Sequence, residues 1–321
     1  RLVCLTGLYC AEYSLCFRYK DRVLFKKQIP VIRVAGGAPL LTQQPDLLAL
    51  FTKVALSAFP DCTALHIPWL PTNSSLFSSL QTVDTVRSGA APYLPCRDHT
   101  THYSISLCPT FDDYLAKLTH KTRYQTRKAL KKLREYCSNQ LELVRIEQPE
   151  QVQAFLNAAT LVARNSWQHA ALGQQMDNCP AEVENYMHFA RQGLLRCYLL
   201  LCKGEVVAFV RGFQFGGVYY YSRTGFDAAL NNFAPGKVLL YLLLEDLHKH
   251  NPPYTFNFQE GDYEYKRHFA TDCRPKADLL LVRAEWQEAF MNKLAIVLHS
   301  VYQRSVVWLK KLAKSDTPVS E

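Results

Sequence analysis

One stretch of the chain, residues 216–269, constrains the fold most strongly, because its elements change type within a short distance. β-branched and aromatic residues favour a strand, whereas a proline–glycine pair before an apolar run with helical spacing favours a helix start. The predicted elements are a strand at 218–222, a turn-rich segment at 225–232, a helix at 238–248 opened by Pro235 and Gly236, a strand at 255–259 and a charged helical turn at 261–269. The pattern therefore places a helix N-terminus between two strands, where a phosphate can bind.

The length and composition indicate a globular chain with more than one core. At 321 residues the chain exceeds what one hydrophobic core usually spans, so two domains are expected. Apolar residues make up 48% of the chain and charged residues 20%, which excludes a disordered chain. No apolar run is long enough to cross a bilayer, and the first thirty residues lack a signal-peptide pattern. Because a strand-like segment follows Arg1 at once, we expect that some N-terminal sequence is missing.

The cysteine pattern predicts buried thiols rather than a metal site. There are 11 cysteines, without any CxxC pair or Cys/His cluster at zinc spacing. We interpret them as small buried residues of a protein in the reducing cytoplasm. They are Cys4, Cys10, Cys16, Cys62, Cys96, Cys108, Cys137, Cys179, Cys197, Cys202 and Cys273.

The positive charge is concentrated in one segment. The formal net charge is +9, and the segment from Leu115 to Arg134 holds eight Lys/Arg and no Asp/Glu. The rest of the chain is close to neutral, so a uniform nucleic-acid-binding coat is not expected. Thr110 and Asp113 resemble a capping box, which predicts a single basic helix from 110 to about 137.

The N-terminal part reads as a small α/β unit. Expected strands are 2–9, 13–18, 22–26, 63–67 and 102–107; extended segments are 83–87 and 91–94; a link with prolines and glycines covers 30–39; and helices are 45–59 and 73–80. No catalytic motif stands out in this part. We therefore predict a degenerate first domain over residues 1–108, followed by the basic helix as a link over 109–140.

The C-terminal part predicts a second domain over 141–284. Its expected elements are a strand at 141–146, helices at 149–171 and 180–192, strands at 195–202, 205–214 and 218–223, the opening stretch, and a strand at 278–283. The two-residue turns at 203–204 and 216–217 predict an antiparallel meander, joined to a strand–helix–strand crossover. Residues 285–313 are predicted to form a basic amphipathic helix, which either docks on the domain or contacts a membrane surface or a second copy.

The order β-α-α-β-β-β-α-β-α-β resembles the Gcn5-related N-acetyltransferase (GNAT) fold. Residues 30–285 are more closely similar to the bacterial CelD or BioF2-like acetyltransferase family. The similarity is carried by Lys121-Thr122-Arg123 with Arg127, Tyr220-Tyr221 before Gly225-Phe226-Asp227, Ala234-Pro235-Gly236 before Leu239-Leu240, and Gly261-Asp262 before Tyr265-Lys266. The family usually has serine at position 234, aspartate at 257 and often arginine at 260, where this chain has Ala234, Asn257 and Glu260.

The resemblance implies tandem GNAT-like domains, each an α/β fold with a mixed, mostly antiparallel sheet flanked by helices. It also implies acetyl-CoA or a longer acyl-CoA as co-substrate, with its diphosphate at the helix start and its pantetheine arm beside a splayed strand. The expected contacts are Tyr221, Arg223, Phe233, Ala234, Pro235, Gly236, Lys237, Val238 and Leu239. We expect Tyr221 and Arg223 to share one face of their strand. Core packing is the alternative for the tyrosines.

Acyl transfer to an amine needs a base for the amine and an acid for the departing thiolate. In the charged turn, Asp262 is the first candidate for the base and Glu260 the second. Tyr265 and Tyr263 are the candidates for the acid, and Lys266 for binding a carboxylate or phosphate. A solvent-facing turn with salt bridges is the alternative interpretation.

The acceptor is expected to be held by residues outside the opening stretch. Lys121, Arg123 and Arg127 match the family motif on the basic helix, and Trp167 is expected to line the acceptor pocket. No metal is expected. The resemblance thus implies a cytoplasmic acyltransferase acting on a small-molecule, lipid-linked or saccharide acceptor in cell-envelope or exopolysaccharide synthesis. Two alternatives stay open, which are a Fem-like aminoacyl-tRNA-dependent ligase and a non-catalytic component of a polysaccharide-synthesis complex.

Overall fold

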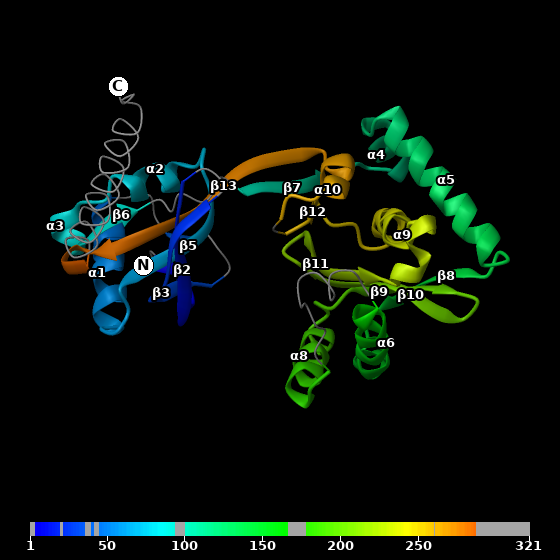
Figure 1. Cartoon of the computed structure of the whole chain (residues 1–321), viewed down its shortest axis with the longest axis horizontal. Helices are drawn as coiled ribbons and strands as arrows, with labels where there is room; N and C mark the ends of the chain where they lie inside the picture. The colour runs from blue at the N-terminus through cyan, green and yellow to red at the C-terminus, as the bar shows by residue number, and fades with distance from the viewer. Residues whose placement is uncertain are drawn as a thin grey trace, which may run out of the picture. The chain divides into compact units, whose positions relative to one another are not determined.

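The computed structural model divides the chain into two compact units, residues 1–100 with 275–321 and residues 101–274 (Figure 1). It describes residues 4–19, 22–35, 40–41, 45–93, 100–165, 178–259 and 261–286. Each unit has a mixed, mostly antiparallel sheet with helices, which confirms the predicted α/β class. The division differs from the predicted one at 108 and 284. The second unit begins at 101 and includes the basic segment, and Pro275 onward belongs to the first unit.

The first unit is built around a sheet with the strand order β2–β3–β5–β13, and β6 also pairs with β13. Its strands are β1 (Cys4–Leu5), β2 (Leu8–Tyr19), β3 (Arg22–Val34), β4 (Leu40–Leu41), β5 (Ala64–Pro71), β6 (Ala90–Tyr93) and β13 (Asp272–Arg283), and its helices are α1 (Pro45–Ala58), α2 (Ser75–Gln81) and α3 (Thr85–Ser88). β3 and β5 are parallel and are joined through α1.

Two local predictions for this unit are wrong. The first is the link predicted to begin at Pro30: the strands predicted at 13–18 and 22–26 are present, but they belong to the long hairpin β2–β3, whose second strand continues through Pro30 to Val34. Residues predicted to be extended at 83–87 include helix α3, because the Asp84 carboxylate accepts the backbone N–H groups of Val86 and Arg87 at 2.9 and 3.1 Å. This N-cap is a local signal that hydrophobic patterning does not register.

The second unit has the strand order β7–β12–β11–β10–β9–β8. Its strands are β7 (Thr100–Ser106), β8 (Leu141–Ile146), β9 (Cys197–Cys202), β10 (Glu205–Phe215), β11 (Val218–Phe226) and β12 (Thr255–Asn257). Its helices are α4 (Phe111–Lys117), α5 (His120–Tyr136), η1 (Pro149–Gln151), α6 (Val152–Arg164), α8 (Pro180–Arg191), η2 (Ala228–Phe233), α9 (Pro235–Lys249) and α10 (Glu264–Phe269).

The element order from residue 141 onward is confirmed, and so is the meander. β9, β10 and β11 are consecutive antiparallel strands. Lys203 and Gly204 have φ of 54° and 82°, and Gly216 and Gly217 have φ of 58° and 75°. These positive values suit the tight turns that join twisted antiparallel strands. The last predicted strand, at 278–283, is the exception: it lies in β13 and pairs with β5 of the first unit.

The predicted single basic helix is two helices. α4 ends at Lys117, and the next residue, Leu118, has an extended ψ of 153°. Thr119 then caps α5 by accepting the N–H of Thr122 at 3.2 Å. Nη1 of Arg123 donates to the carbonyl groups of Leu115, Ala116 and Leu118 at 3.1, 3.2 and 2.9 Å. In a continuous helix these carbonyls would accept N–H groups of the following turn. At the break they lose those donors, and Arg123 replaces them.

Helices cover both faces of the second sheet. α9 and α5 pack on one face over an apolar cluster that includes Tyr219, Tyr221 and Phe256 (Figure 1). α6 and α8 pack on the other face over a cluster that includes Phe209 and Tyr186. We call these the α9 face and the α8 face. Within the described residues, no helix is long and apolar enough to span a membrane.

The prediction that all cysteines are free thiols is wrong. Cys137, which caps α5, and Cys202 of β9 form a disulfide with Cα atoms 5.2 Å apart. No local pattern indicates this pair, because the two cysteines are 65 residues apart and meet only when α5 packs on the sheet. Cys10 and Cys62 of the first unit remain thiols, with sulfur atoms 3.8 Å apart.

Candidate active site

The second unit contains a wedge between β11 and β12. These parallel strands pair only over Val218–Thr255, Tyr219–Phe256 and Tyr220–Asn257. β12 ends there, while β11 continues to Phe226 with β10 as its partner. Backbone groups on the β12 side of this continuation have no ladder partner on β12. The predicted splayed strand is therefore present. Its unpaired end, up to Phe226, leads directly into η2 and α9.

A β-bulge changes the direction of one predicted cofactor contact. Arg223 is opposite Arg211, but the next pair is Tyr221 with Gly212, so Ser222 is the extra residue. Residues directly opposite each other share a face. Arg211 contacts Tyr186 of α8, so Arg223 also belongs to the α8 face, whereas Tyr221 is buried under α9. The prediction that Tyr221 and Arg223 share a face is wrong for this reason.

The start of α9 has an unusual backbone. Ala234 adopts the left-handed conformation, with φ 49° and ψ 53°, and its carbonyl accepts the N–H groups of Lys237 and Val238 at 3.0 and 3.1 Å. Two of the three N–H groups predicted to face a diphosphate are thus engaged within the turn, and that of Gly236 remains. A Cβ on Gly236 would lie 3.0 Å from the Phe226 ring, so glycine allows α9 to approach β11 closely.

The other predicted diphosphate contacts divide into core and surface residues. Pro235, Val238 and Leu239 are buried in the core, so their side chains support the helix start rather than face a ligand. Lys237 is half-buried. Phe233 is also half-buried, and its ring lies 4.4 Å from that of Tyr136 on α5.

A lysine of α5 lies beside this helix start. Lys132 donates from Nζ to the carbonyl of Asn232 at 3.3 Å and lies 5.2 Å from the Phe233 ring. Lys132 thus lies beside the end of η2, and Lys237 lies in the first turn of α9. The positive end of the α9 dipole adds to their charge.

Asp262, the first predicted base, is held in an ion pair. Its two carboxylate oxygens accept hydrogen bonds from Arg267, and one also accepts the Tyr103 hydroxyl at 2.8 Å. The hydrogen bonds from Arg267 and then from Tyr103 lower the pKa of Asp262. A carboxylate stabilised in its charged form is a weaker base, so the geometry suits Asp262 to fixing α10 against β7.

The two predicted acids differ in exposure. The Tyr263 and Tyr265 rings are stacked 6.1 Å apart, and Tyr263 is 39% exposed. Burial raises the pKa of Tyr265, whose ring also lies 6.1 Å from Phe258. Tyr263 is therefore better placed to exchange protons with solvent. Glu260 and Trp167 lie outside the described residues.

Lys266 is a buried lysine of α10. It is 3% exposed, and its Nζ donates to the carbonyl of Gln259 at 3.4 Å and lies 5.3 Å from the Tyr263 ring. These contacts hold the loop after β12 against α10. The amine of the predicted ligand-binding lysine is thus engaged with the protein's own backbone and an aromatic ring.

A histidine that the sequence analysis missed lies at the open end of the wedge. His102 Nε2 is 2.8 Å from Oδ1 of Asn257, the last residue of β12. The same oxygen accepts the backbone N–H of Gln259 at 2.8 Å. A backbone N–H can only donate, so this atom is the amide oxygen and Nε2 carries the proton. In the neutral ring, Nδ1 is then the basic nitrogen.

His102 also belongs to the α8 face. Tyr103 and Ile105 of β7 are buried in the cluster under α9, so His102 and Ser104 alternate to the other side. Ser104 is opposite Asn257, and Asn257 is opposite Tyr220. The only sequence signal was the asparagine at 257 in place of the family's aspartate, and its partner could not be found without the strand register.

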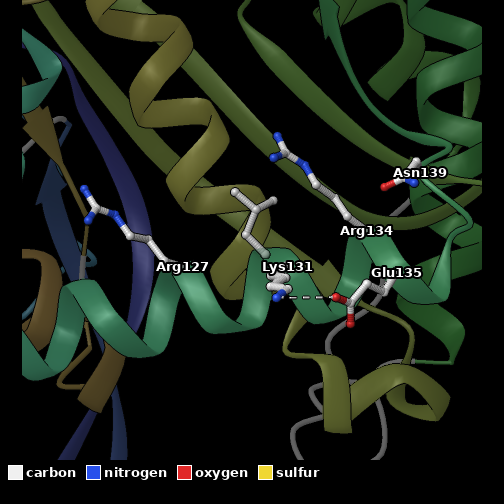
Figure 2. A pocket seen from close by; sticks show the side chains of 6 residues that line it. Arg127, Lys131, Arg134, Glu135 and Asn139 are labelled. Atoms are coloured by element: carbon white, nitrogen blue, oxygen red, sulfur yellow. Dashed lines mark ion pairs between the residues drawn. The ribbon is translucent and has the colours of Figure 1, made fainter.

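The basic segment forms a shallow groove on α5. The groove has a volume of about 410 Å³ and is lined by Arg127, Leu130, Lys131, Arg134, Glu135 and Asn139. Arg127 and Arg134 point to the same side of the helix, and Lys131 pairs with Glu135 at 3.9 Å (Figure 2). Of the predicted acceptor contacts, Arg127 lines this groove. Lys121 is exposed on α5, and Arg123 caps α4.

No cation site is evident in the part of the chain that the structure describes, where no three or more His, Cys, Asp or Glu side chains are grouped to hold a metal ion. The polar groups of the site are instead a histidine, hydroxyls, an amide and arginines.

Residues 120–267 match the family model described as "Acetyltransferase (GNAT) domain". This matched segment, together with the fold, supports a GNAT-type domain in the second unit. The segment begins at the first residue of α5 and ends in α10, so it includes the wedge, the start of α9 and Asp262. His102 precedes it. No curated protein matches the sequence.

Solved structures share the fold over most of the chain. FemX superposes with a TM-score of 0.58 at 9% identity, over 88% of this chain and 90% of that one. The C-terminal domain of a putative lysylphosphatidylglycerol synthetase from Agrobacterium fabrum gives 0.53 at 12%, over 83% and 82%. L-PGS from Bacillus licheniformis gives 0.52 at 13%, over 80% and 81%. At these identities the likeness shows the fold alone.

Proposed function

We propose that the second unit transfers an acyl group from acetyl-CoA or a longer acyl-CoA to an amine or a sugar hydroxyl. The observation that carries this proposal is the wedge between β11 and β12, which opens directly before the start of α9. A thioester arm can add to the unpaired edge of β11 there through backbone hydrogen bonds. The backbone N–H of Gly236 and the side-chain amines of Lys237 and Lys132 would then bind the diphosphate at the positive end of α9.

In the proposed reaction, the acceptor approaches from the α8 face. Its nitrogen or oxygen attacks the thioester carbonyl, a bond to that carbon forms and the C–S bond breaks. His102 Nδ1 takes the proton of the nucleophile, while Asn257 holds the ring through Nε2. The departing thiolate is protonated by the Tyr263 hydroxyl, which regains its proton from solvent. Asp262 positions α10 and Tyr103 in this scheme.

The finer family assignment and the setting are also part of the proposal. The motifs at 121–127, 225–227, 234–236 and 261–266 support the CelD or BioF2-like family, and so an acceptor from cell-envelope or exopolysaccharide synthesis. We propose a cytoplasmic location, where acyl-CoA is available. Disulfides are rare in the cytosol, so the Cys137–Cys202 bond should then form only on oxidation. Alkylation of thiols in intact cells, followed by mass spectrometry, tests this.

Isothermal titration of the purified chain with acetyl-, octanoyl- and palmitoyl-CoA tests the donor. We expect saturable binding of at least one of them, and acyl-CoA in the native mass spectrum of the purified protein. Desulfo-CoA serves as a control that retains the diphosphate but has no thioester. Binding of no acyl-CoA would remove the acyl-CoA proposal.

The groove on α5 supports a second candidate, an aminoacyl-tRNA-dependent transfer. Arg127, Lys131 and Arg134 line it with a single carboxylate, Glu135, and such basic faces suit a phosphodiester backbone. The two candidates separate in one measurement. A steep loss of tRNA affinity with added salt, weakened by Arg127→Gln with Arg134→Gln and combined with no acyl-CoA binding, favours the tRNA donor. Salt-insensitive or absent RNA binding excludes it.

A further inference from the structure

Two cysteines that are far apart in the sequence meet in the first unit. Cys10 of β2 and Cys62, which precedes β5, are 52 residues apart, yet the Cys62 thiol donates to the Cys10 sulfur at 3.8 Å. At this distance the sulfur atoms are in contact but are not bonded. A disulfide needs them about 2.05 Å apart, an approach that side-chain rotation can supply.

The register of the hairpin β2–β3 places one of these thiols outside and the other inside. Cys10 is opposite Ile32, and residues directly opposite each other share a face. Ile32 is fully buried in the apolar cluster that also contains Cys62. Cys10 continues this face onto the outermost described strand of the sheet, where its side chain is exposed. An accessible thiol therefore lies over a buried one.

The backbone around Cys62 is tied to the same hairpin. The Thr63 N–H and hydroxyl both donate to the Pro30 carbonyl at 2.9 Å, and Pro30 belongs to β3, the partner strand of β2. On the other side, Nε of Arg283 donates to the carbonyl of Cys62 at 2.8 Å. The contact between the two thiols therefore rests on fixed backbone positions.

The two thiols differ in reactivity because they differ in burial. Cys62 is 3% exposed, and burial together with the hydrogen bond to Cys10 raises the pKa of the Cys62 thiol to about 11. At neutral pH this thiol stays protonated, whereas the nucleophile in thiol chemistry is the thiolate. The exposed Cys10 is thus the thiol that meets an oxidant first.

We propose that Cys10 and Cys62 are a redox pair, which a low-molecular-weight disulfide such as glutathione disulfide oxidises to a reversible protein disulfide. The new bond clasps β2 to the turn before β5. This site goes beyond the proposed acyl transfer and does not depend on it.

The oxidation proceeds in two exchange steps. The Cys10 thiolate attacks one sulfur of the oxidant, a mixed disulfide forms on Cys10, and the first glutathione thiolate leaves. Cys10 then no longer carries the thiol that helps to raise the pKa of Cys62, so Cys62 loses its proton to solvent more readily. The Cys62 sulfur attacks that of Cys10, and the second glutathione thiolate leaves. Two protein thiols are oxidised, one oxidant molecule is reduced, and the two released thiolates take up the two protons.

Peptide mapping tests the pair directly. The folded chain, with Cys10 and Cys62 as thiols, is incubated with glutathione disulfide, the remaining thiols are alkylated, and unreduced peptides are analysed by mass spectrometry. We expect a peptide pair linked through Cys10 and Cys62, which excess reduced glutathione should remove.

Single variants separate the two steps. In Cys62→Ser, Cys10 should retain glutathione as a stable mixed disulfide, because the second thiol is missing. In Cys10→Ser, Cys62 should stay unmodified, because it is buried. Cys179→Ser removes an exposed thiol at the start of α8 and should leave the Cys10–Cys62 bond unchanged. Circular dichroism melts confirm that each variant is folded.

Hydrogen exchange measures the clasp. Because the bond closes a loop of 52 residues, exchange through unfolding of the first unit should slow by about 30- to 1,000-fold, the range typical of a disulfide. The second unit serves as the internal reference, and its exchange should not change.

Three results would overturn the redox pair. The first is an unmodified chain in which Cys10 keeps glutathione as it does in Cys62→Ser, because the two thiols then do not meet in solution. The second is a Cys10 that does not react with the oxidant. The third is a bond from either residue to a different cysteine. A Cys10–Cys62 bond that forms without slowing exchange overturns the clasp. The acyl-CoA titrations decide the donor separately, since none of these measurements involves acyl-CoA.

Discussion

The two units repeat one topology but differ at the positions where a ligand would bind. In the first, an antiparallel strand, a parallel pair joined by a helix and another antiparallel strand follow as β2, β3–α1–β5 and β13. In the second, the same arrangement is β10, β11–α9–β12 and β7. This repetition confirms the predicted tandem arrangement. Differences between the units therefore show what the shared topology alone does not provide.

The first difference is where the parallel pairing stops. β3 pairs with β5 through Arg33 and ends at the next residue, Val34. β11 leaves β12 after Tyr220 and continues to Phe226. Only in the second unit does the strand before the crossover helix, β11, continue well beyond the end of its pairing with its parallel neighbour, β12. A wedge therefore depends on how far one strand outlasts its pairing, not on the order of elements.

The second difference is charge and burial. The first turn of α1 carries Asp46, whereas that of α9 carries Lys237. In each unit a side-chain pair joins the strand after the crossover helix to its antiparallel neighbour. In the first unit this pair is His66 of β5 and Asp278 of β13, which lie 3.1 Å apart, and His66 is 2% exposed. In the second pair, His102 and Asn257 are half-buried. The histidine at this position is therefore buried in the first unit and partly accessible to solvent in the second.

The largest effect is expected from His102. His102→Gln keeps a group that can hydrogen-bond to Asn257 but removes the basic nitrogen, so kcat should fall by about 10²- to 10⁴-fold, the usual contribution of a general base. Acyl-CoA affinity should not change. Stopped-flow detection of released thiol and titration calorimetry measure the two quantities.

The equivalent change in the first unit is the control. His66→Gln should leave transfer intact, because His66 is buried within the first unit, which has no wedge between its parallel strands. Asp262→Asn should reduce kcat much less than His102→Gln does. If Asp262→Asn abolished transfer in a folded protein while His102→Gln remained active, the assignment of the base would be reversed.

Removing the disulfide should destabilise the second unit more than the first. Cys137–Cys202 closes a loop of 65 residues in the second unit, worth about 4 kcal/mol in the chain-entropy description. Cys137→Ser with Cys202→Ser should therefore speed hydrogen exchange in α5 and β9, as followed by mass spectrometry. Cys10→Ser with Cys62→Ser is the control in the first unit. Equal acceleration in both units would mean that they unfold together.

Lys237 tests whether the start of α9 binds an anion. An acidic residue in the first turn of a helix stabilises it by about 0.3–1 kcal/mol, so Lys237→Glu should not lower the melting temperature. The same carboxylate would repel a diphosphate, and acyl-CoA affinity should fall about tenfold or more, as for loss of a charged hydrogen bond. Lys53→Glu on α1 makes the same change in the first unit. Unchanged affinity in Lys237→Glu would place the diphosphate elsewhere.

The sequence predicted the second unit well where local signals are strong. The turns at 203–204 and 216–217 and the Pro235-Gly236 helix start depend on neighbouring residues, and each is present. Patterning failed where one hydrogen bond decides the outcome. Thr119 was assigned to the middle of a helix, yet its hydroxyl caps a new one.

The candidate site was predictable only in part, because its key contacts are long-range. The splayed strand was implied by the family resemblance, whereas His102 and Asn257 are 155 residues apart in sequence and meet through the register of β7 with β12. A single bulge at Ser222 moved Arg223 to the other face. Register and bulges are set by packing between strands, which residue periodicity does not encode.

The smallest effect concerns the buried pair of the first unit. Burial alone raises the pKa of Asp278, but the hydrogen bonds from His66 and from the Trp69 N–H outweigh it, so the pKa is lowered from its ordinary 3.8. Because the folded-state pKa is the lower one, the stabilisation is present above the ordinary value and is lost as pH falls through the folded-state pKa. Asp278→Asn should therefore cost about 1 kcal/mol at pH 7, typical of one hydrogen bond, and progressively less below pH about 4.

Urea unfolding at several pH values, followed by fluorescence, measures this difference, since Trp69 lies beside the pair and reports on it. Asp46→Asn is the matched control, because Asp46 pairs with Arg87 at an exposed position where ion pairs contribute little. A difference between Asp278→Asn and the unmodified chain that stays constant from pH 7 to pH 3 would show that the pair acts only through shape. The first unit would then have closed its site by packing rather than by charge.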